Sequence, residues 1–236
     1  MNDATHRRQS TKQAMRRLGV DRFSTVQLLI VLAALLIAAP FVEELEGGHL
    51  ILSVLFSLVM IAAVFAVAKR KRSLAIALVL AIPAIIARWI NQLRPDLLPT
   101  AVFLVGALLL LAFVIGHLLY FILRAPVVTV EVLCASIAAY LMLGLTWTVA
   151  YWLVDQLTPG GAFSFNTNRG AHSMNGFTGF YFSFITLSTV GYGDITPVSQ
   201  AARWLAAMEA MTGLLYVAVL IARLVSLYST PKSNDS

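Results

Sequence analysis

Residues 189–194 read TVGYGD, and their types and spacing are suited to holding a cation that has lost its water. Such a cation needs a cage of oxygen ligands, and successive backbone carbonyls provide one only when they all point to the same side. This arrangement requires backbone angles that alternate between the ordinary and the left-handed regions. Gly191 and Gly193 reach the left-handed region without penalty because glycine has no Cβ atom. The segment therefore predicts cation coordination by main-chain oxygens, and the alternative is a glycine-rich turn without such a role.

Most of the chain is more apolar than a water-soluble domain. Of its 236 residues, 59% are hydrophobic and 12% are charged, whereas soluble domains have about 45–50% apolar and about 25% charged residues. A membrane-spanning helix needs about 17–25 mainly apolar residues. Six segments meet or approach this requirement: 24–42, 49–68, 73–90, 99–123, 127–154 and 201–228. The sequence therefore predicts an all-α membrane protein with six transmembrane helices.

The stretch between the last two spans indicates a re-entrant segment. Residues 155–175 form a polar loop, and the apolar-aromatic residues 176–188 are too few to cross a membrane. Irregular backbone at membrane depth is tolerated only where protein or a water-filled cavity shields it. The residues between 176 and 188 are therefore expected to form a half-helix that enters and leaves from one side.

The apolar segments and the polar stretches between them predict that the chain has four parts. We expect a basic cytoplasmic tail at 1–23, a four-helix peripheral domain at 24–124, a pore domain at 125–228 and a short cytoplasmic tail at 229–236. The last tail is too short for a ligand-binding domain.

Basic residues predict the orientation in the membrane. With the N-terminus inside, 13 of the 17 Lys and Arg residues are cytoplasmic, as the positive-inside rule requires. We therefore expect a multi-pass protein of the plasma membrane with both termini cytoplasmic. The net charge of +6 is explained by this bias and by attraction to anionic lipid, and it requires no nucleic acid. Arg88, near the outer end of its span, is expected to extend to the membrane interface.

The sequence contains no recognisable catalytic motif. It has no His, Cys or carboxylate cluster with metal-ligand spacing, no Walker motif and no nucleophile elbow, and Cys134 is its single cysteine. We therefore do not expect an enzyme or an organic cofactor.

The order of helix, polar loop, half-helix, TVGYGD and helix resembles the pore module of potassium channels. The resemblance covers residues 127–228, and the whole chain resembles bacterial six-helix potassium channels without large cytoplasmic regulators. It implies a homotetramer that conducts K⁺ passively, with one filter strand per subunit. It also implies that the carbonyls of Thr189, Val190, Gly191 and Tyr192, with the Thr189 hydroxyl, coordinate successive K⁺ ions and that Gly193 completes the filter.

Side chains around the filter are expected to support it. Val190 and Tyr192 should point away from the pore, and Tyr181 and Phe182 should pack as an aromatic cuff around Tyr192. The phenol of Tyr181 should donate a hydrogen bond to Asp194 at the outer mouth.

Two residues of the last helix are candidates for a role in gating or filter support. Glu209 is a carboxylate within the membrane, where such groups are costly and usually functional. It should lie behind the half-helix, either as a proton-sensitive brace or as a purely structural hydrogen-bonding group. Gly213 is either a hinge of the inner helix or a site of close helix packing.

Three apolar residues follow at helical spacing: Leu214, Val217 and Ile221. They would line the cavity and a lower constriction that gates by dewetting, or they would belong to an ordinary core.

Strong voltage gating is not expected. Moving one charge through the membrane field is worth about 2.3 kcal/mol per 100 mV, so a steep response needs several arginines in one helix. The fourth span, 99–123, has no Lys or Arg. The short connection after it predicts that the four-helix unit packs against the pore of its own subunit.

Two other functions remain open from the sequence. An active potassium transporter can use the same pore module, but it usually carries four degenerate repeats in one chain, and this chain has one. A non-conducting membrane scaffold would have no need of both Gly191 and Gly193.

Overall fold

A computed structural model describes residues 22–42, 45–68, 71–94, 97, 99–166, 174 and 176–228. The expected tails at 1–23 and 229–236 therefore lie outside the described residues, apart from positions 22 and 23. The elements are α2 (Arg22–Val42), α3 (Gly48–Ala66), α4 (Lys71–Leu93), α5 (Thr100–Arg124), α6 (Val130–Leu157), β1 (Phe163–Phe165), α7 (Gly176–Leu187), β2 (Ile195–Pro197) and α8 (Gln200–Tyr228).

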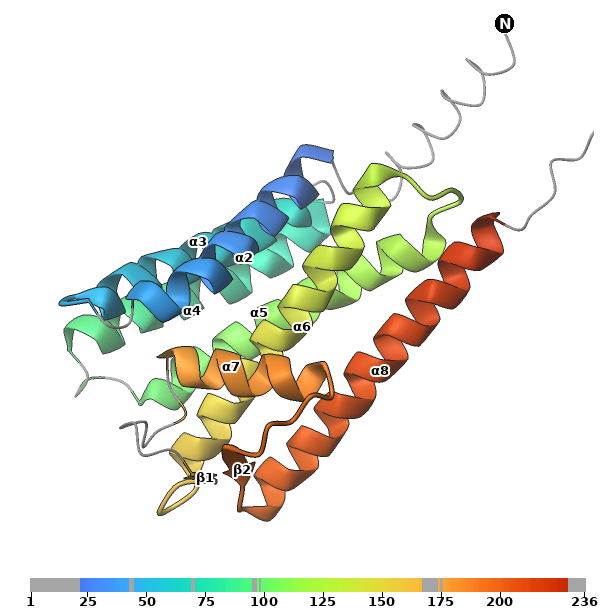
Figure 1. Cartoon of the computed structure of the whole chain (residues 1–236). Coiled ribbons are helices and arrows are strands. Elements are labelled where there is room, and N and C mark those ends of the chain that lie inside the picture. Colours follow the sequence, from blue (N-terminus) through green and yellow to red (C-terminus); the bar gives the residue numbers. More distant parts are fainter. Residues whose placement is uncertain are drawn as a thin grey trace, which may run out of the picture.

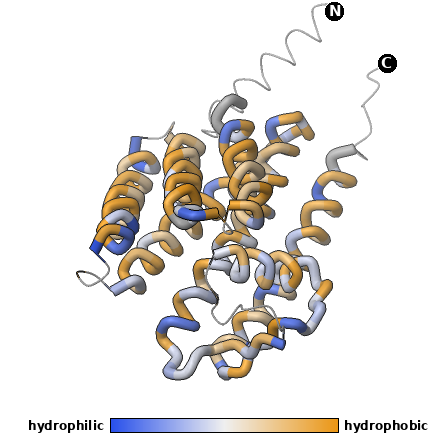
Figure 2. Tube along the Cα trace, turned by 60° about the vertical axis from the view of Figure 1, so that its left-hand side comes forward, coloured by the Kyte–Doolittle hydropathy of each residue, from blue (hydrophilic) through white to orange (hydrophobic). Residues whose placement is uncertain are grey.

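The helices confirm the all-α membrane fold. Within the described ranges, five of them, α2, α4, α5, α6 and α8, are long and apolar enough to cross a membrane. The apolar part of α3, Leu50–Ala66, is shorter than these five, so the predicted sixth span stays a prediction. Hydrophobic residues follow the long helices and hydrophilic residues gather near their ends (Figure 2).

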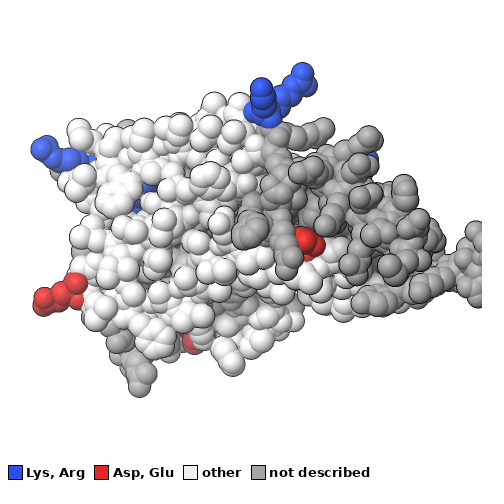
Figure 3. All heavy atoms as spheres, turned by 90° about the horizontal axis from the view of Figure 1, so that it is seen from above, with Lys and Arg blue, Asp and Glu red and all other residues white. Residues whose placement is uncertain are grey.

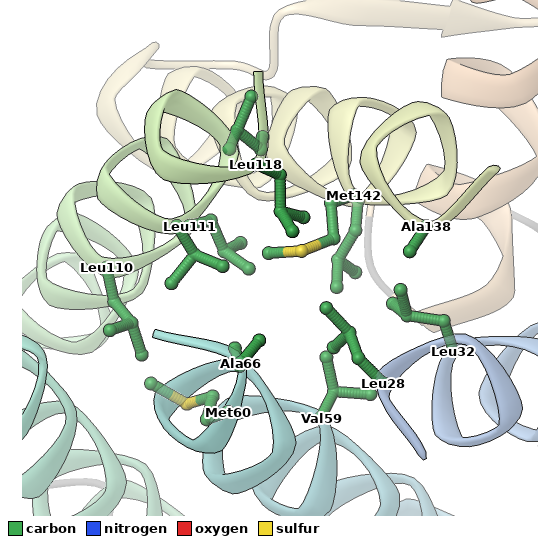
Figure 4. Close-up of a cluster of buried hydrophobic side chains, with 14 of the residues drawn as sticks. Leu28, Leu32, Val59, Met60, Ala66, Leu110, Leu111, Leu118, Ala138 and Met142 are labelled. Atoms are coloured by element: carbon green, nitrogen blue, oxygen red, sulfur yellow. The ribbon is translucent and has the colours of Figure 1, made fainter. Parts of the chain in front are cut away.

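One continuous core joins the four-helix unit to the first pore helix. Side chains from α2, α3, α5 and α6 point toward one another (Figure 4). The labelled residues, each at most 1% exposed, are Leu28, Leu32, Val59, Met60, Ala66, Leu110, Leu111, Leu118, Ala138 and Met142. Within this one chain, α2 and α5 pack against α6, and the predicted packing of the four-helix unit on the pore of its own subunit stays a prediction.

The predicted pore domain contains a short helix beside two long ones. In Figure 1, α7 lies next to α6 and α8 at the end of the molecule where β1 and β2 are found. These two strands form an antiparallel pair in which Phe163, Ser164 and Phe165 face Pro197, Thr196 and Ile195. The sequence did not predict this ribbon, because three-residue strands carry too little periodicity to be recognised.

Charged side chains are sparse among the described residues of one face of the molecule. The face seen in Figure 3 is mostly uncharged, with Lys, Arg, Asp and Glu mainly near its edges. Such a surface is suited to contact with lipid.

Candidate ion-selectivity filter

The end of α7 orients the segment that follows it. The amides of Val190 and Gly191 both donate to the carbonyl of Ile185, at 2.9 and 3.2 Å, and the Thr189 amide donates to the carbonyl of Thr186 at 2.9 Å. These N–H groups are thus directed back to the last turn of α7. The chain leaves the helix in a tight, hydrogen-bonded turn instead of an unconstrained loop.

The backbone angles alternate along this segment. Thr189, Gly191 and Gly193 have φ angles of 60°, 53° and 80°, and the residues between them do not have positive φ. The left-handed angles expected for Gly191 and Gly193 are confirmed. Among the described residues, no hydrogen bond is made to the carbonyls of residues 189–193, so these oxygens are available as ligands.

Thr189 extends the alternation to a position that the sequence did not suggest. A β-branched residue with positive φ is a genuine outlier, and holding it there costs about 1–3 kcal/mol. Thr189 is the only non-glycine residue with positive φ in the described part of the chain. Backbone strain is therefore concentrated at the first residue of the candidate filter.

The predicted hydrogen bond at the end of the filter is present. The hydroxyl of Tyr181 donates to Oδ2 of Asp194 at 2.7 Å, and the amide of Ile195 donates to Oδ1 at 3.1 Å. The Asp194 carbonyl accepts from the Asn166 amide at 2.8 Å, which ties this point to the β1–β2 ribbon. Desolvation and the nearby Asp194 raise the pKa of Tyr181 to about 12, so the phenol retains its donor hydrogen at neutral pH.

Phe182 packs inside its own subunit. Its ring is only 4% exposed, and it makes edge-on contacts with Tyr151 at 4.9 Å and with Phe163 at 5.2 Å between ring centroids. The rotation of α7 turns Phe182 toward α6 and β1, whereas Tyr181 contacts Asp194. The predicted cuff around Tyr192 stays a prediction.

Glu209 joins three helices behind the filter. It is fully buried on α8, and its Oε1 lies 2.6 Å from the hydroxyl oxygen of Ser183 on α7. Its Oε2 accepts a hydrogen bond from the hydroxyl of Tyr151 on α6. The Ser183 oxygen is also 2.7 Å from the carbonyl oxygen of Gly144 on α6. This position behind α7 agrees with the expectation, whereas Ser183 and Tyr151 were not identified from the sequence.

The signal for these partners was their polarity within apolar helices. A hydroxyl in a membrane helix needs an acceptor, but several such residues occur in the pore unit, and helix rotation decides which of them meet. Tyr216 is a further example, since its hydroxyl on α8 donates to the carbonyl of Ser136 on α6 at 2.6 Å.

Gly213 packs closely against the end of α7. A Cβ atom at this position would overlap the carbonyl oxygen of Leu187 and would lie 3.0 Å from the carbonyl carbon. Close helix packing, one of the two interpretations of this glycine, is thus present in the structure. The hinge remains a prediction.

The three candidate gate residues are not core residues of their own subunit. Leu214, Val217 and Ile221 are 65%, 43% and 56% exposed on α8. Their side chains are therefore available to a water-filled cavity, to lipid or to another copy of the chain.

Arg88 makes its contacts within the bundle. Its guanidinium donates to the Ser53 hydroxyl of α3 at 2.7 Å and lies 5.1 Å from the centre of the Phe103 ring on α5. Its predicted extension to the membrane interface stays a prediction.

Comparisons with known proteins agree with this geometry. Residues 127–230 match the Ion_trans_2 family, described as "Ion channel". Over 47 residues the chain is 45% identical to Two-pore potassium channel 4 of Arabidopsis thaliana, covering 20% of this chain and 16% of that protein. Over 88 residues it is 31% identical to Two pore potassium channel b of Oryza sativa subsp. japonica, covering 37% of this chain and 21% of that protein.

A bacterial protein is also similar. Over 45 residues the chain is 49% identical to Protein LctB of Geobacillus stearothermophilus, covering 19% of this chain and 33% of that protein. The matches therefore span a third or less of the length of these curated relatives. No solved structure is similar at a significant level. Together with the all-α membrane fold, the matches show a membrane protein whose residues 127–230 are similar to the ion channel family.

Proposed function

We propose that this protein is a homotetrameric, potassium-selective channel that conducts K⁺ passively across the membrane. The alternating φ angles of Thr189, Gly191 and Gly193, with carbonyls that accept no hydrogen bond among the described residues, carry this proposal. The names of the two-pore potassium channels to which the chain is similar support potassium as the ion.

In this proposal, four copies of residues 189–193 surround one axis. The carbonyls of Thr189, Val190, Gly191 and Tyr192, with the Thr189 hydroxyl, replace the water around successive K⁺ ions. Whether discrimination comes from the size of the cage or from the number and field strength of its carbonyls, both accounts predict K⁺ over Na⁺. Asp194 and Tyr181 hold the outer end of the filter in place through their hydrogen bond.

Exposure of the filter in a single subunit supports assembly with other copies. Val190 and Tyr192 are 53% and 72% exposed, although contact with water is unfavourable for a valine side chain and for an aromatic ring. Leu214, Val217 and Ile221 continue this exposed surface along α8. In a tetramer these three side chains line the inner cavity and form apolar rings that can gate by dewetting.

A hydrogen count supports a protonated Glu209. The Ser183 hydroxyl has a single hydrogen, yet its oxygen lies within hydrogen-bonding distance of both Glu209 and the Gly144 carbonyl. If Glu209 is neutral, it donates to Ser183, Ser183 donates to Gly144, and Tyr151 donates to the other carboxyl oxygen. If Glu209 is ionised, one of the two Ser183 contacts has no hydrogen between its oxygens.

The neutral carboxyl then acts as a brace between α8, α7 and α6. The titratable groups that face it are Tyr151, by its hydrogen bond, and Tyr140, by its electrostatic interaction, both on α6. Ionisation would break one contact at the back of the pore helix and would weaken the support of the filter. Proton sensitivity and structural support are in this view two consequences of one network.

The remaining expectations concern the membrane. The protein crosses the plasma membrane six times, with α3 as the sixth span, both termini in the cytoplasm and its basic cytoplasmic residues near anionic lipid. The four-helix unit at 24–124 does not sense voltage strongly. Its tight packing on α6 supports a fixed peripheral domain (Figure 1).

Ion flux from proteoliposomes tests the function. The purified chain should release K⁺ down its gradient, much faster than Na⁺, and native mass spectrometry should give four subunits. Gly191→Ala should abolish the flux because it forces a side chain into the left-handed region. Gly116→Ala is the matched control, since a Cβ atom at position 116 meets nothing within 4 Å.

The same experiment separates the alternatives. Transport of K⁺ only against a gradient and with an energy source would indicate a transporter subunit. A folded tetramer without flux would indicate a scaffold, and equal K⁺ and Na⁺ flux would contradict the proposed filter.

A further inference from the structure

A cavity lies between the four-helix unit and the pore unit, at the end of the bundle where α7 begins. Its volume is about 380 Å³, which falls in the usual range of ligand pockets, about 300–1,000 Å³. Its apolar wall includes Leu35, Leu52, Phe56 and Phe180, which belong to α2, α3 and α7. The cavity is therefore bordered both by the peripheral helices and by the helix that orients the filter.

The polar wall of this cavity contains a cation without an ionic partner in the described part of the chain. Arg88 lines the cavity, and the interactions that it makes there are one hydrogen bond to Ser53 and the contact with the Phe103 ring. Its Nε is buried and has no hydrogen-bond partner. A guanidinium has several N–H donors, so most of its capacity is unused.

The charge of this side chain indicates the chemistry of an occupant. A guanidinium in the wall of a cavity favours an occupant with anionic oxygen atoms. An unpaired ionisable group inside a membrane protein is costly, and such groups usually mark functional sites.

Asp155 restricts the charge of the occupant. It lines the cavity as well, and its two oxygens accept hydrogen bonds from the amides of Ala162 at 2.7 Å and Met174 at 3.3 Å. These backbone donors compensate the carboxylate only in part. A ligand with a single negative charge therefore suits the cavity better than a doubly charged one.

We infer that this cavity binds a membrane phospholipid, with the phosphodiester at Arg88 and the adjoining apolar part of the lipid along Leu35, Leu52 and Phe56. The phosphodiester carries a single negative charge, and guanidinium groups bind phosphate oxygens through strong charge-assisted hydrogen bonds. The apolar wall distinguishes a lipid from a free anion. Because Phe180 and Gly176 of α7 also line the cavity, the lipid would contact the pore helix directly.

Lipid retention tests this inference independently of ion conduction. Wild-type protein, Arg88→Gln and Arg94→Gln are purified in detergent, and the phospholipids that remain bound per subunit are counted by native mass spectrometry. Arg94 is the matched control because it is an exposed arginine just beyond the end of the same helix. Wild type and Arg94→Gln should retain one lipid more per subunit than Arg88→Gln.

Thermal unfolding with added lipid gives a second measurement. The phosphatidylglycerol concentration that gives half-maximal stabilisation should rise about tenfold in Arg88→Gln, as expected for loss of a charge-assisted hydrogen bond. Leu52→Trp keeps the arginine but fills the cavity from a partly exposed position. It should also lose the lipid, and it decides the question if Arg88→Gln does not fold.

Three results would overturn the inference. Equal lipid retention by the Arg88 and Arg94 variants would show that Arg88 does not hold the lipid. Undiminished retention by Leu52→Trp would place the lipid outside the cavity. Stabilisation by inorganic phosphate or glycerophosphate that equals the effect of the lipid would indicate an anion site instead.

Discussion

Gly213 of the inner helix lies directly against the carbonyl of Leu187, the last residue of α7. The candidate filter begins two residues later, at Thr189. The contact needs a residue without a side chain, because a Cβ atom would overlap the Leu187 oxygen. We therefore expect a displacement of α8 at this height to move the end of α7, where the candidate filter begins.

Gly213→Ala tests this contact. The added methyl must push α8 from α7, and overpacking of this kind costs about 1–3 kcal/mol. We expect a tetramer that dissociates at lower temperature and a filter that discriminates less well between K⁺ and Na⁺. Gly116→Ala, in open space on α5, should change neither property. Unchanged thermal stability with altered opening in single-channel records would favour the hinge instead.

Tyr181→Phe removes the hydrogen bond to Asp194 and preserves the ring. A hydrogen bond to a charged group contributes about 1.5–3 kcal/mol, so the outer end of the filter should lose order. K⁺ flux should decline faster when the protein is kept in low K⁺, because the ions no longer compensate for the missing contact. Tyr120→Phe changes an exposed tyrosine on α5 and serves as the control. Identical rates of decline in both variants would remove Tyr181 from the filter support.

Glu209→Gln distinguishes the pH sensitivity of residue 209 from its structural support of the helices. An amide reproduces the neutral carboxyl, since its NH₂ group donates to Ser183 and its oxygen accepts from Tyr151. We expect normal flux in this variant at neutral pH. In the wild type, flux should fall as rising pH ionises Glu209, and in Glu209→Gln it should stay constant. A wild-type pH profile that matches that of the variant would leave Glu209 with a structural role only.

Glu209→Ala examines the structural part of the same network. The alanine leaves the Tyr151 hydroxyl without its acceptor in a buried site, which costs about 1–3 kcal/mol. Thermal dissociation of the tetramer should therefore occur at lower temperature than in wild type or in Glu209→Gln. Equal stability of the alanine and glutamine variants would show that the hydrogen bonds to Glu209 contribute little.

The response to voltage should be weak. The helix α5 has no Lys or Arg before Arg124, its last residue, and one charge crossing the field is worth only about 2.3 kcal/mol per 100 mV. Planar-bilayer recordings between about −100 and +100 mV, a range that includes the usual resting potentials of membranes, should show a nearly constant open probability. A steep sigmoidal response would require a voltage sensor that the sequence does not contain.

The sequence by itself determined the features that depend on local chemistry. Long apolar segments can satisfy their backbone groups within lipid only as helices, so the all-α membrane fold followed from composition. The left-handed angles of Gly191 and Gly193 followed from the absence of a Cβ atom. The hydrogen bond from Tyr181 to Asp194 was also expected, from the resemblance of this part of the chain to the pore module of potassium channels.

Only the tertiary structure decided which side chains meet across helices. The rotation of α7 turned Phe182 to Tyr151 and Phe163, and the crossing of α6, α7 and α8 joined Glu209 to Ser183 and Tyr151. It also placed Arg88 inside the bundle. A one-dimensional pattern cannot supply these relations, because a small change in helix rotation or offset moves a side chain to another neighbour while the apolar pattern stays the same.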